Sequence, residues 1–240
     1  FRRRGSIPGR PIVTFRSIDF PPAEKDRGDR VEEVATKILS DRPCHLGEGC
    51  TYDPATDTAW WFDIVERTLF QADLASGAVT AHALPWMASV VAFIDDQRQL
   101  LATENGLYVR DIANGSLTLH VALEADNAAT RSNDGRVHAS GALWIGAMGR
   151  NAENGAGAIY HFGGGELRRL YSGISIPNAI CFSPDGATAY FTDTRKAILY
   201  RVAIDPTNAL PTGDPAPLFD HRGGVGGLDG AVVDAEGLIW

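Results

Sequence analysis

The chain has 240 residues, of which 44% are hydrophobic and 22% charged, a composition that is ordinary for a globular protein with one large core. Its net charge is -8, and residues 1–30 carry eight Lys or Arg against four Asp or Glu, so the remainder is near -12. This acidity argues against nucleic acid as a partner and suits a cation or a small polar ligand. No apolar run approaches the roughly 18 residues of a membrane span, so no membrane partner is expected.

The first 30 residues predict no folded unit. Arg2-Arg3-Arg4 and scattered prolines break any lasting periodicity, so we interpret residues 1–30 as a disordered extension or an upstream translation artefact. The alternative is an Arg-rich targeting segment, which is not a secretory signal because it lacks an apolar stretch. Residues 31–39 could form a strand or, by their pair of Glu residues, a short helix, and we favour the strand. Residues 31–240 are expected to form a single domain.

Cysteine usage indicates the compartment. The cysteines show no CxxC spacing. Their number is odd and they form no dense pattern typical of a disulfide framework, which favours a reducing cytoplasm. The three residues are Cys44, Cys50 and Cys181. We therefore expect a cytoplasmic protein.

From Leu46 onward the sequence predicts an all-β domain. Short strands alternate with turns rich in Gly, Asp and Asn, such as Ser76-Gly77 and Asn114-Gly115. This pattern is typical of a sandwich, a barrel or a propeller. The strands expected in chain order are residues 59–64, 69–73, 79–84, 90–94, 100–103, 106–109, 117–121, 144–147, 158–161, 167–171, 189–192, 198–204 and 217–219.

The spacing of large anchor residues selects the propeller. Aromatic or leucine anchors fall at positions 60, 100, 144, 190 and 240, so the repeat is 40 to 50 residues long. Such a period with about four strands marks propeller blades, and we expect the anchors to be core residues between blades. Trp240 ends only the start of a fifth repeat, whereas a propeller closes its ring to cover its sheet edges. The sequence therefore predicts a propeller truncated after the start of the fifth blade, with an open ring, poor stability and a tendency to associate. We expect no helix longer than two turns between residues 46 and 240.

One polar residue stands 11 or 12 positions before four of these anchors: Glu48, Asn133, Asn178 and Asp229. We infer that the four hold one structural position in successive repeats and converge on the channel, because the first strand of each blade lines it. Two carboxylates and an amide oxygen, from Glu48, Asn178 and Asp229, form a hard-oxygen set of charge -2 that suits a divalent cation. Without His or Cys the set favours Ca²⁺, Mg²⁺ or Mn²⁺ over Zn²⁺. The alternative for each residue alone is turn or cap chemistry.

Four short motifs carry a likeness to a known family: Leu46-Gly47-Glu48-Gly49, Arg131-Ser132-Asn133-Asp134-Gly135, Pro177-Asn178-Ala179-Ile180 and Leu228-Asp229-Gly230. Together they resemble the signature motifs of the regucalcin/gluconolactonase family, which includes senescence-marker-protein-like lactonases. The likeness covers about residues 36–240. It implies a six-bladed β-propeller that hydrolyses sugar lactones with a divalent metal.

The resemblance also implies roles for single residues. By it, Glu48, Asn178 and Asp229 are the metal ligands, and Arg131 and Asn133 hold the substrate. Asp229 is also the family's candidate for the general base. The cation would act as a Lewis acid on the lactone carbonyl, and Asp229 would supply the activated nucleophile. Ca²⁺ is the first choice from the oxygen ligands, and Zn²⁺, Mg²⁺ and Mn²⁺ stay open.

The likeness has departures. After Gly146-Ala147-Met148 many members carry an acid near the substrate, whereas this chain has Gly149-Arg150-Asn151, which leaves the preferred sugar open. Ser132 and Leu228 also differ from common family residues. Outside the motifs, further candidates for the channel or pocket, with turn or core roles as the alternative, are Asp193, Glu104, Asn105, Trp86 and Met87.

The predicted function is a metal-dependent hydrolase that opens a sugar lactone of the aldonolactone or gluconolactone type to the acid. Its partner would be a small molecule, and the oligomeric state stays open. Two other functions fit the same residues. One is another propeller hydrolase, such as a phosphotriesterase or an arylesterase, with the same cation. The other is a non-catalytic propeller that binds Ca²⁺.

Overall fold

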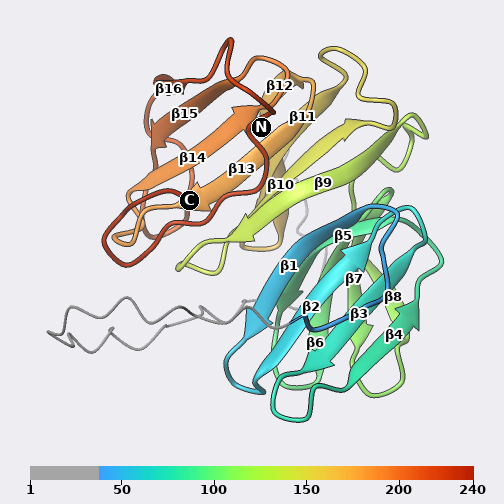
Figure 1. The fold of residues 1–240 in the computed structure, drawn as a ribbon. Helices are drawn as coiled ribbons and strands as arrows, with labels where there is room; N and C mark the ends of the chain where they lie inside the picture. The colour runs from blue at the N-terminus through green and yellow to red at the C-terminus, as the bar shows by residue number, and fades with distance from the viewer. Residues whose placement is uncertain (1–37) are drawn as a thin grey trace, which may run out of the picture.

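The computed structural model describes residues 38–240, which form an all-β fold of sixteen strands (Figure 1). The strands make four separate four-stranded antiparallel sheets, and each sheet is a meander of consecutive strands. The predicted extension at residues 1–30, and the strand expected at 31–39 except for its last two residues, lie outside the described residues.

The first two sheets consist of β1 (Gly47–Asp53), β2 (Thr58–Asp63), β3 (Thr68–Asp73), β4 (Val79–Ala83), β5 (Ala88–Phe93), β6 (Arg98–Thr103), β7 (Gly106–Asp111) and β8 (Leu117–Ala122). The last two consist of β9 (Thr130–Val137), β10 (Leu143–Gly149), β11 (Gly157–Gly163), β12 (Glu166–Ile174), β13 (Pro177–Phe182), β14 (Thr188–Asp193), β15 (Ile198–Ala203) and β16 (Ala216–Asp220). This is a four-blade, propeller-like arrangement, as the blade period predicted.

Asp side chains close many of the turns. Asp73 Oδ1 accepts a hydrogen bond from the backbone N–H of Ser76 at 2.7 Å, and Asp111 Oδ1 accepts one from Asn114 at 3.0 Å. In such turns a short side chain replaces a backbone partner, and Gly77 supplies the left-handed backbone with φ 74°. The Gly, Asp and Asn residues that predicted turns in the sequence therefore lie at the ends of these strands.

Apolar side chains fill the space between neighbouring sheets, in three clusters that join successive blades. Trp60, Leu100 and Trp144 are buried there, as predicted for the anchors. Tyr190 is only half-buried, because strand alternation turns its neighbours towards the third sheet. Trp240 is 73% exposed, since residues 221–240 form no sheet against which it could pack. The expectation that all five anchors are core residues is wrong for these two.

The first strand of each sheet lies innermost. β1 contacts β5, β5 contacts β9, and β9 contacts β13. Each of these inner strands carries one extra residue relative to its neighbour, in a β-bulge. Bulges re-aim side chains and are frequent beside active sites.

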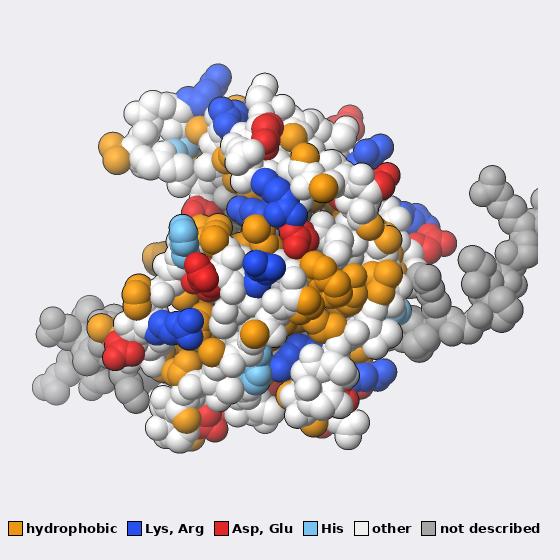
Figure 2. Space-filling view, turned by 90° about the vertical axis from the view of Figure 1, so that its right-hand side faces the viewer, with side chains coloured by type: hydrophobic (Ala, Val, Ile, Leu, Met, Phe, Trp, Pro, Cys, Tyr) orange, Lys and Arg blue, Asp and Glu red, His pale blue; other side chains and the backbone are white. Residues whose placement is uncertain are grey.

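The described residues contain no helix, so the prediction of no helix beyond two turns is confirmed for them, and they accordingly include no helix long and apolar enough to span a membrane. On the face shown in Figure 2, basic and acidic side chains are interspersed rather than gathered into a stripe of one sign.

Candidate active site

A cavity of about 620 Å³ opens among the inner strands. Glu48 lines it from β1, and Asp134 and Arg136 line it from β9. Residues 230–232, which directly follow Asp229, line it as well. The cavity therefore brings together three of the four motifs that the sequence singled out.

The bulges decide which residues share a position. Glu48 and Asn178 are each the last paired residue before the bulge of their strand. In β9 that place belongs to Ser132, and Asn133 follows one residue later, inside the bulge. Ser132 is buried and accepts a hydrogen bond from the hydroxyl of Ser89 in the second sheet at 2.8 Å. The inference of one shared position thus holds for Glu48 and Asn178 and is wrong for Asn133. Asp229 lies in no strand.

Asn133 nevertheless touches its predicted partners. Its Nδ2 donates to Asn178 Oδ1 at 2.8 Å and to the Pro177 carbonyl at 3.0 Å. Its Oδ1 accepts from Arg131 Nη1 at 2.9 Å, and the same Nη1 donates to the Ser132 carbonyl. Asn133 therefore ties Arg131 of the third blade to Asn178 of the fourth.

Three carboxylates share the electrostatics of the site. Burial raises the pKa of Glu48, and the nearby charges of Asp229 and Asp134 raise it further, whereas Arg131 opposes the shift. Burial also raises the pKa of Asp134, whereas a hydrogen bond from the backbone of Ile180 and the charge of Arg136 lower it by less. Like charges disfavour each other's ionised form, so this concentration of negative charge favours a bound cation.

Asp134 was given no role from the sequence. Its Oδ2 accepts from the backbone N–H of Ile180 at 2.8 Å, and its Oδ1 accepts from Gly135 at 2.8 Å. It therefore links β9 to β13 while adding negative charge to the cavity wall. Its position inside the Arg131–Gly135 motif was the signal that could have found it.

The residues present fit a divalent cation. The described residues contain no group of three or more His, Cys, Asp and Glu side chains arranged to hold a metal ion. A cation here would therefore need the amide oxygen of Asn178 beside the carboxylates of Glu48 and Asp229. Asn178 Oδ1 accepts one hydrogen bond and keeps a second lone pair for a ligand. Hard oxygen donors of this kind suit Ca²⁺ or Mg²⁺.

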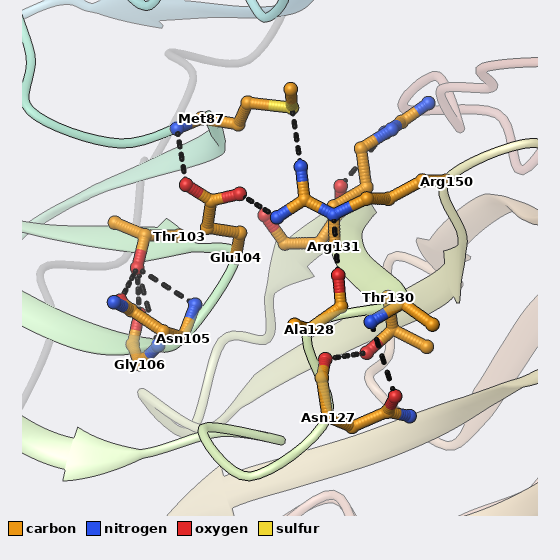
Figure 3. Close-up of polar contacts among 12 residues, drawn as sticks. Met87, Thr103, Glu104, Asn105, Gly106, Asn127, Ala128, Thr130, Arg131 and Arg150 are labelled. Atoms are coloured by element: carbon orange, nitrogen blue, oxygen red, sulfur yellow. Dashed lines mark hydrogen bonds and ion pairs between the residues drawn. The ribbon is translucent and has the colours of Figure 1, made fainter.

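The weaker candidates take structural or rim positions. Asp193 is buried and accepts from the backbone of Ser175 and Ile176 at 3.0 and 3.1 Å, which is turn chemistry rather than a channel role. Glu104 forms an ion pair with Arg150, whose Nε also donates to the Ala128 carbonyl at 2.8 Å (Figure 3).

Met87 and Arg131 lie beside this ion pair. Met87 Sδ accepts from Arg150 Nη1 at 3.7 Å, and its backbone N–H donates to Glu104 at 3.4 Å (Figure 3). Burial lowers the pKa of Arg131, Glu48 raises it, and Arg150 lowers it further. A second guanidinium therefore lies close to the one predicted to hold the substrate.

Comparison with known proteins identifies the family. Residues 46–240 match the family described as SMP-30/Gluconolactonase/LRE-like region. The chain belongs to this SMP-30/gluconolactonase family. It is 57% identical over 204 residues to "Putative sugar lactone lactonase" of Rhizobium meliloti, covering 85% of this chain and 69% of that protein. It is 32% identical over 214 residues to L-arabinolactonase of Azospirillum brasilense, covering 85% and 68%.

Solved structures agree with the family assignment. The fold superposes on regucalcin of Agrobacterium tumefaciens, described as a calcium-binding protein, with a TM-score of 0.84 and 56% identity. The match covers 85% of this chain and 69% of that one. Similarity to named lactonases supports lactone hydrolysis as the reaction of this SMP-30/gluconolactonase family member.

Proposed function

We propose that the protein is a divalent-metal-dependent sugar lactonase, a carboxylic ester hydrolase that opens an aldonolactone to its acid. The observation that supports the proposal is the set of interactions that link Arg131 to Glu48 and, through Asn133, to Asn178. Glu48 interacts electrostatically with Asp229 and with Arg131, and Arg131 connects to Asn178 through Asn133. The lactonase relatives supply the reaction class.

Glu48, Asn178 and Asp229 would hold the cation. When bound, it supplies Lewis-acid polarisation of the lactone carbonyl and stabilises the negative charge that develops on its oxygen. Ca²⁺ is the cation that we propose first, because the ligands are oxygens and the regucalcin relative is described as calcium-binding.

Arg131 binds the sugar in this proposal. Its Nη1 is occupied by the Ser132 carbonyl and Asn133, whereas its Nε and Nη2 have no partner among the described residues. These N–H groups can donate to ring hydroxyls, and a guanidinium keeps its proton, so it cannot act as a base. Asn133 uses both amide hydrogens within the protein and contributes its remaining Oδ1 lone pair and the orientation of Arg131.

Asp229 is the proposed general base. Its side chain is exposed beside the cavity, so water can reach it. The carboxylate takes a proton from the attacking water while the water oxygen bonds to the lactone carbon. The ring C–O bond then breaks, and the ring oxygen receives a proton to give the hydroxy acid.

Lactone kinetics test this proposal. The protein is freed of metal with EDTA and assayed by proton release against a panel of aldonolactones, with Ca²⁺, Mg²⁺, Mn²⁺ or Zn²⁺ added back. We expect hydrolysis that disappears in EDTA and returns with metal. Failure to open any lactone with any of the four metals, or equal turnover of a phosphotriester or an aryl ester, would contradict it.

We also propose three further features of the protein, which concern its domain organisation, its number of blades and its location. We propose that residues 31–240 belong to a single propeller domain and that the closed ring has six blades, as the family likeness implies. A cytoplasmic location rests on the cysteine pattern alone.

A further inference from the structure

The partners of two asparagines fix the direction of a hydrogen-bond chain. Arg131 can only donate, so Asn133 presents Oδ1 to it, and the Pro177 carbonyl can only accept, so Asn133 presents Nδ2 there. The same Nδ2 also faces Asn178, which must therefore present its oxygen. This leaves Asn178 Nδ2 to donate to Thr194 Oγ1 at 2.9 Å.

Thr194 continues the chain to the segment that holds the proposed base. Its hydroxyl accepts from Asn178 and donates to the Leu228 carbonyl at 2.7 Å. Leu228 directly precedes Asp229. Only a hydroxyl at position 194 can accept and donate at once in this geometry, so the link requires Thr or Ser.

The segment around Asp229 has few other constraints. Residues 221–240 contain no strand of a sheet, and their backbone–backbone hydrogen bonds lie in residues 221–224 and 232–240, with none in the described residues 225–231. On the far side of Asp229, Arg136 Nη2 donates to the Ala231 carbonyl at 3.0 Å. The backbone on both sides of Asp229 is therefore held by a hydrogen bond, from Thr194 of the fourth blade on one side and from Arg136 of the third blade on the other.

Close packing of Gly227 against Thr194 supports the hydrogen bond from Thr194 to the Leu228 carbonyl. A Cβ added at Gly227 would lie 2.8 Å from Thr194 Cγ2, so the absence of a side chain lets the segment approach the threonine. Thr194 itself is held in place, because its backbone N–H donates to the Ile176 carbonyl at 3.0 Å.

We propose that Thr194 is a positioning residue, which fixes Asp229 relative to the Asn178 oxygen by joining Asn178 to the Leu228 carbonyl. The inference rests on the proposed function for the roles of Asp229 and Asn178, whereas the tether itself does not depend on it. Thr194 touches neither the substrate nor the cation in this arrangement.

The test compares Thr194→Val, which keeps the shape and removes the hydroxyl, with Thr194→Ser, which keeps the hydroxyl. Thr68→Val is the matched control, because Thr68 Oγ1 donates to the Glu66 carbonyl and Thr68 does not line the cavity. We expect Thr194→Val to lower kcat on the order of tenfold with KM within about twofold, because Arg131 is unaltered. The other two variants should keep parental kcat within about twofold.

Hydrogen–deuterium exchange of the metal-free protein separates this inference from the proposed function. Thr194→Val should accelerate exchange at least about fivefold at the backbone N–H groups of His221 and Val232, which are hydrogen-bonded on either side of the tethered residues, and Thr194→Ser and Thr68→Val should not. If the parent opens no lactone, the proposed function fails, and the exchange result alone still decides the tether. Parental exchange in Thr194→Val would overturn the proposal, as would parental kcat in an active enzyme.

A second pair of variants covers the case in which Thr194→Val does not fold. Gly227→Ala removes no polar group and should crowd the Thr194 methyl, so we expect the same faster exchange and lower kcat. Adding Thr194→Ser to it removes that methyl and should restore both. If Gly227→Ala matches the parent, or if the double variant is no better than Gly227→Ala alone, the proposal is refuted.

Discussion

Glu48→Gln should weaken cation binding and yet stabilise the metal-free protein. Glu48 is half-buried, and burial together with Asp229 and Asp134 raises its pKa against the pull of Arg131. The net environment therefore disfavours the ionised carboxylate. Gln keeps the shape and one oxygen but carries no charge, so the substitution relieves the repulsion.

The expected magnitudes have opposite signs in the two conditions. Solvent screens a half-buried group, so we take the relief at about 0.5–1 kcal/mol, which is roughly 1–4 °C in Tm for a protein of this size. A cation at 100 times its Kd stabilises the parent by about 2.7 kcal/mol, or roughly 5–10 °C. Glu48→Gln should therefore melt above the parent in EDTA and below it in saturating Ca²⁺.

Calorimetry at pH 7 with and without Ca²⁺ checks this reversal, with the exposed carboxylate of Glu66 changed to Gln as the control. A carboxyl with a raised pKa destabilises the fold above that pKa, and the penalty disappears as the pH falls and the group takes up its proton. The difference in Tm between Glu48→Gln and the parent, measured in EDTA, should therefore become smaller as the pH is lowered. A lower Tm of the variant in EDTA, or undiminished stabilisation by Ca²⁺, would refute the reasoning.

Four further predictions follow from single contacts. Asp229→Asn keeps an oxygen and removes the base, so turnover should vanish while calorimetric metal affinity falls only partly; parental turnover would disprove the base. Asn133→Ala should leave the metal bound and raise KM about 2–10-fold, from about 0.5–1.5 kcal/mol per lost hydrogen bond; an unchanged KM in lactone kinetics would oppose this. Burial raises the pKa of Cys181 to about 12, so the folded protein should lose stability as the pH rises from 9 towards 12, and a thiol reagent at pH 8 should label exposed Cys50 but not Cys181. Trp144→Phe leaves the buried Ala209 carbonyl unpaired, so thermal melting should show a loss of about 1–3 kcal/mol, and an unchanged Tm would contradict it.

The sequence predicted the blades well because their signals are local. Turn residues such as Asp73 and Gly77 act on the backbone within a few positions, so their spacing gives the strand ends directly. The repeat of the anchors gives the number of strands per blade, since each blade must present apolar residues to its neighbours. The candidate residues of the site were found in the same way, from motifs at a fixed place in each repeat.

Register and burial were decided by tertiary structure. Counting positions back from an anchor does not fix which residue precedes the bulge, and the strand pairing gives that place to Ser132, one residue before Asn133. Burial of an anchor needs a neighbouring sheet, which Trp144 has and Trp240 lacks among the described residues. A sequence period carries neither kind of information.

The sequence by itself determined an all-β repeat fold and its family, and it predicted a set of oxygen-bearing side chains for a cation. Only the tertiary structure decided how these side chains meet. Asp134 adds charge to the cavity, and Thr194 connects Asn178 to the segment of Asp229, although 34 positions separate Thr194 from Leu228. The physical reason is that a hydrogen bond or a charge interaction depends on distance in space, and such a contact between separate blades leaves no pattern in the local sequence.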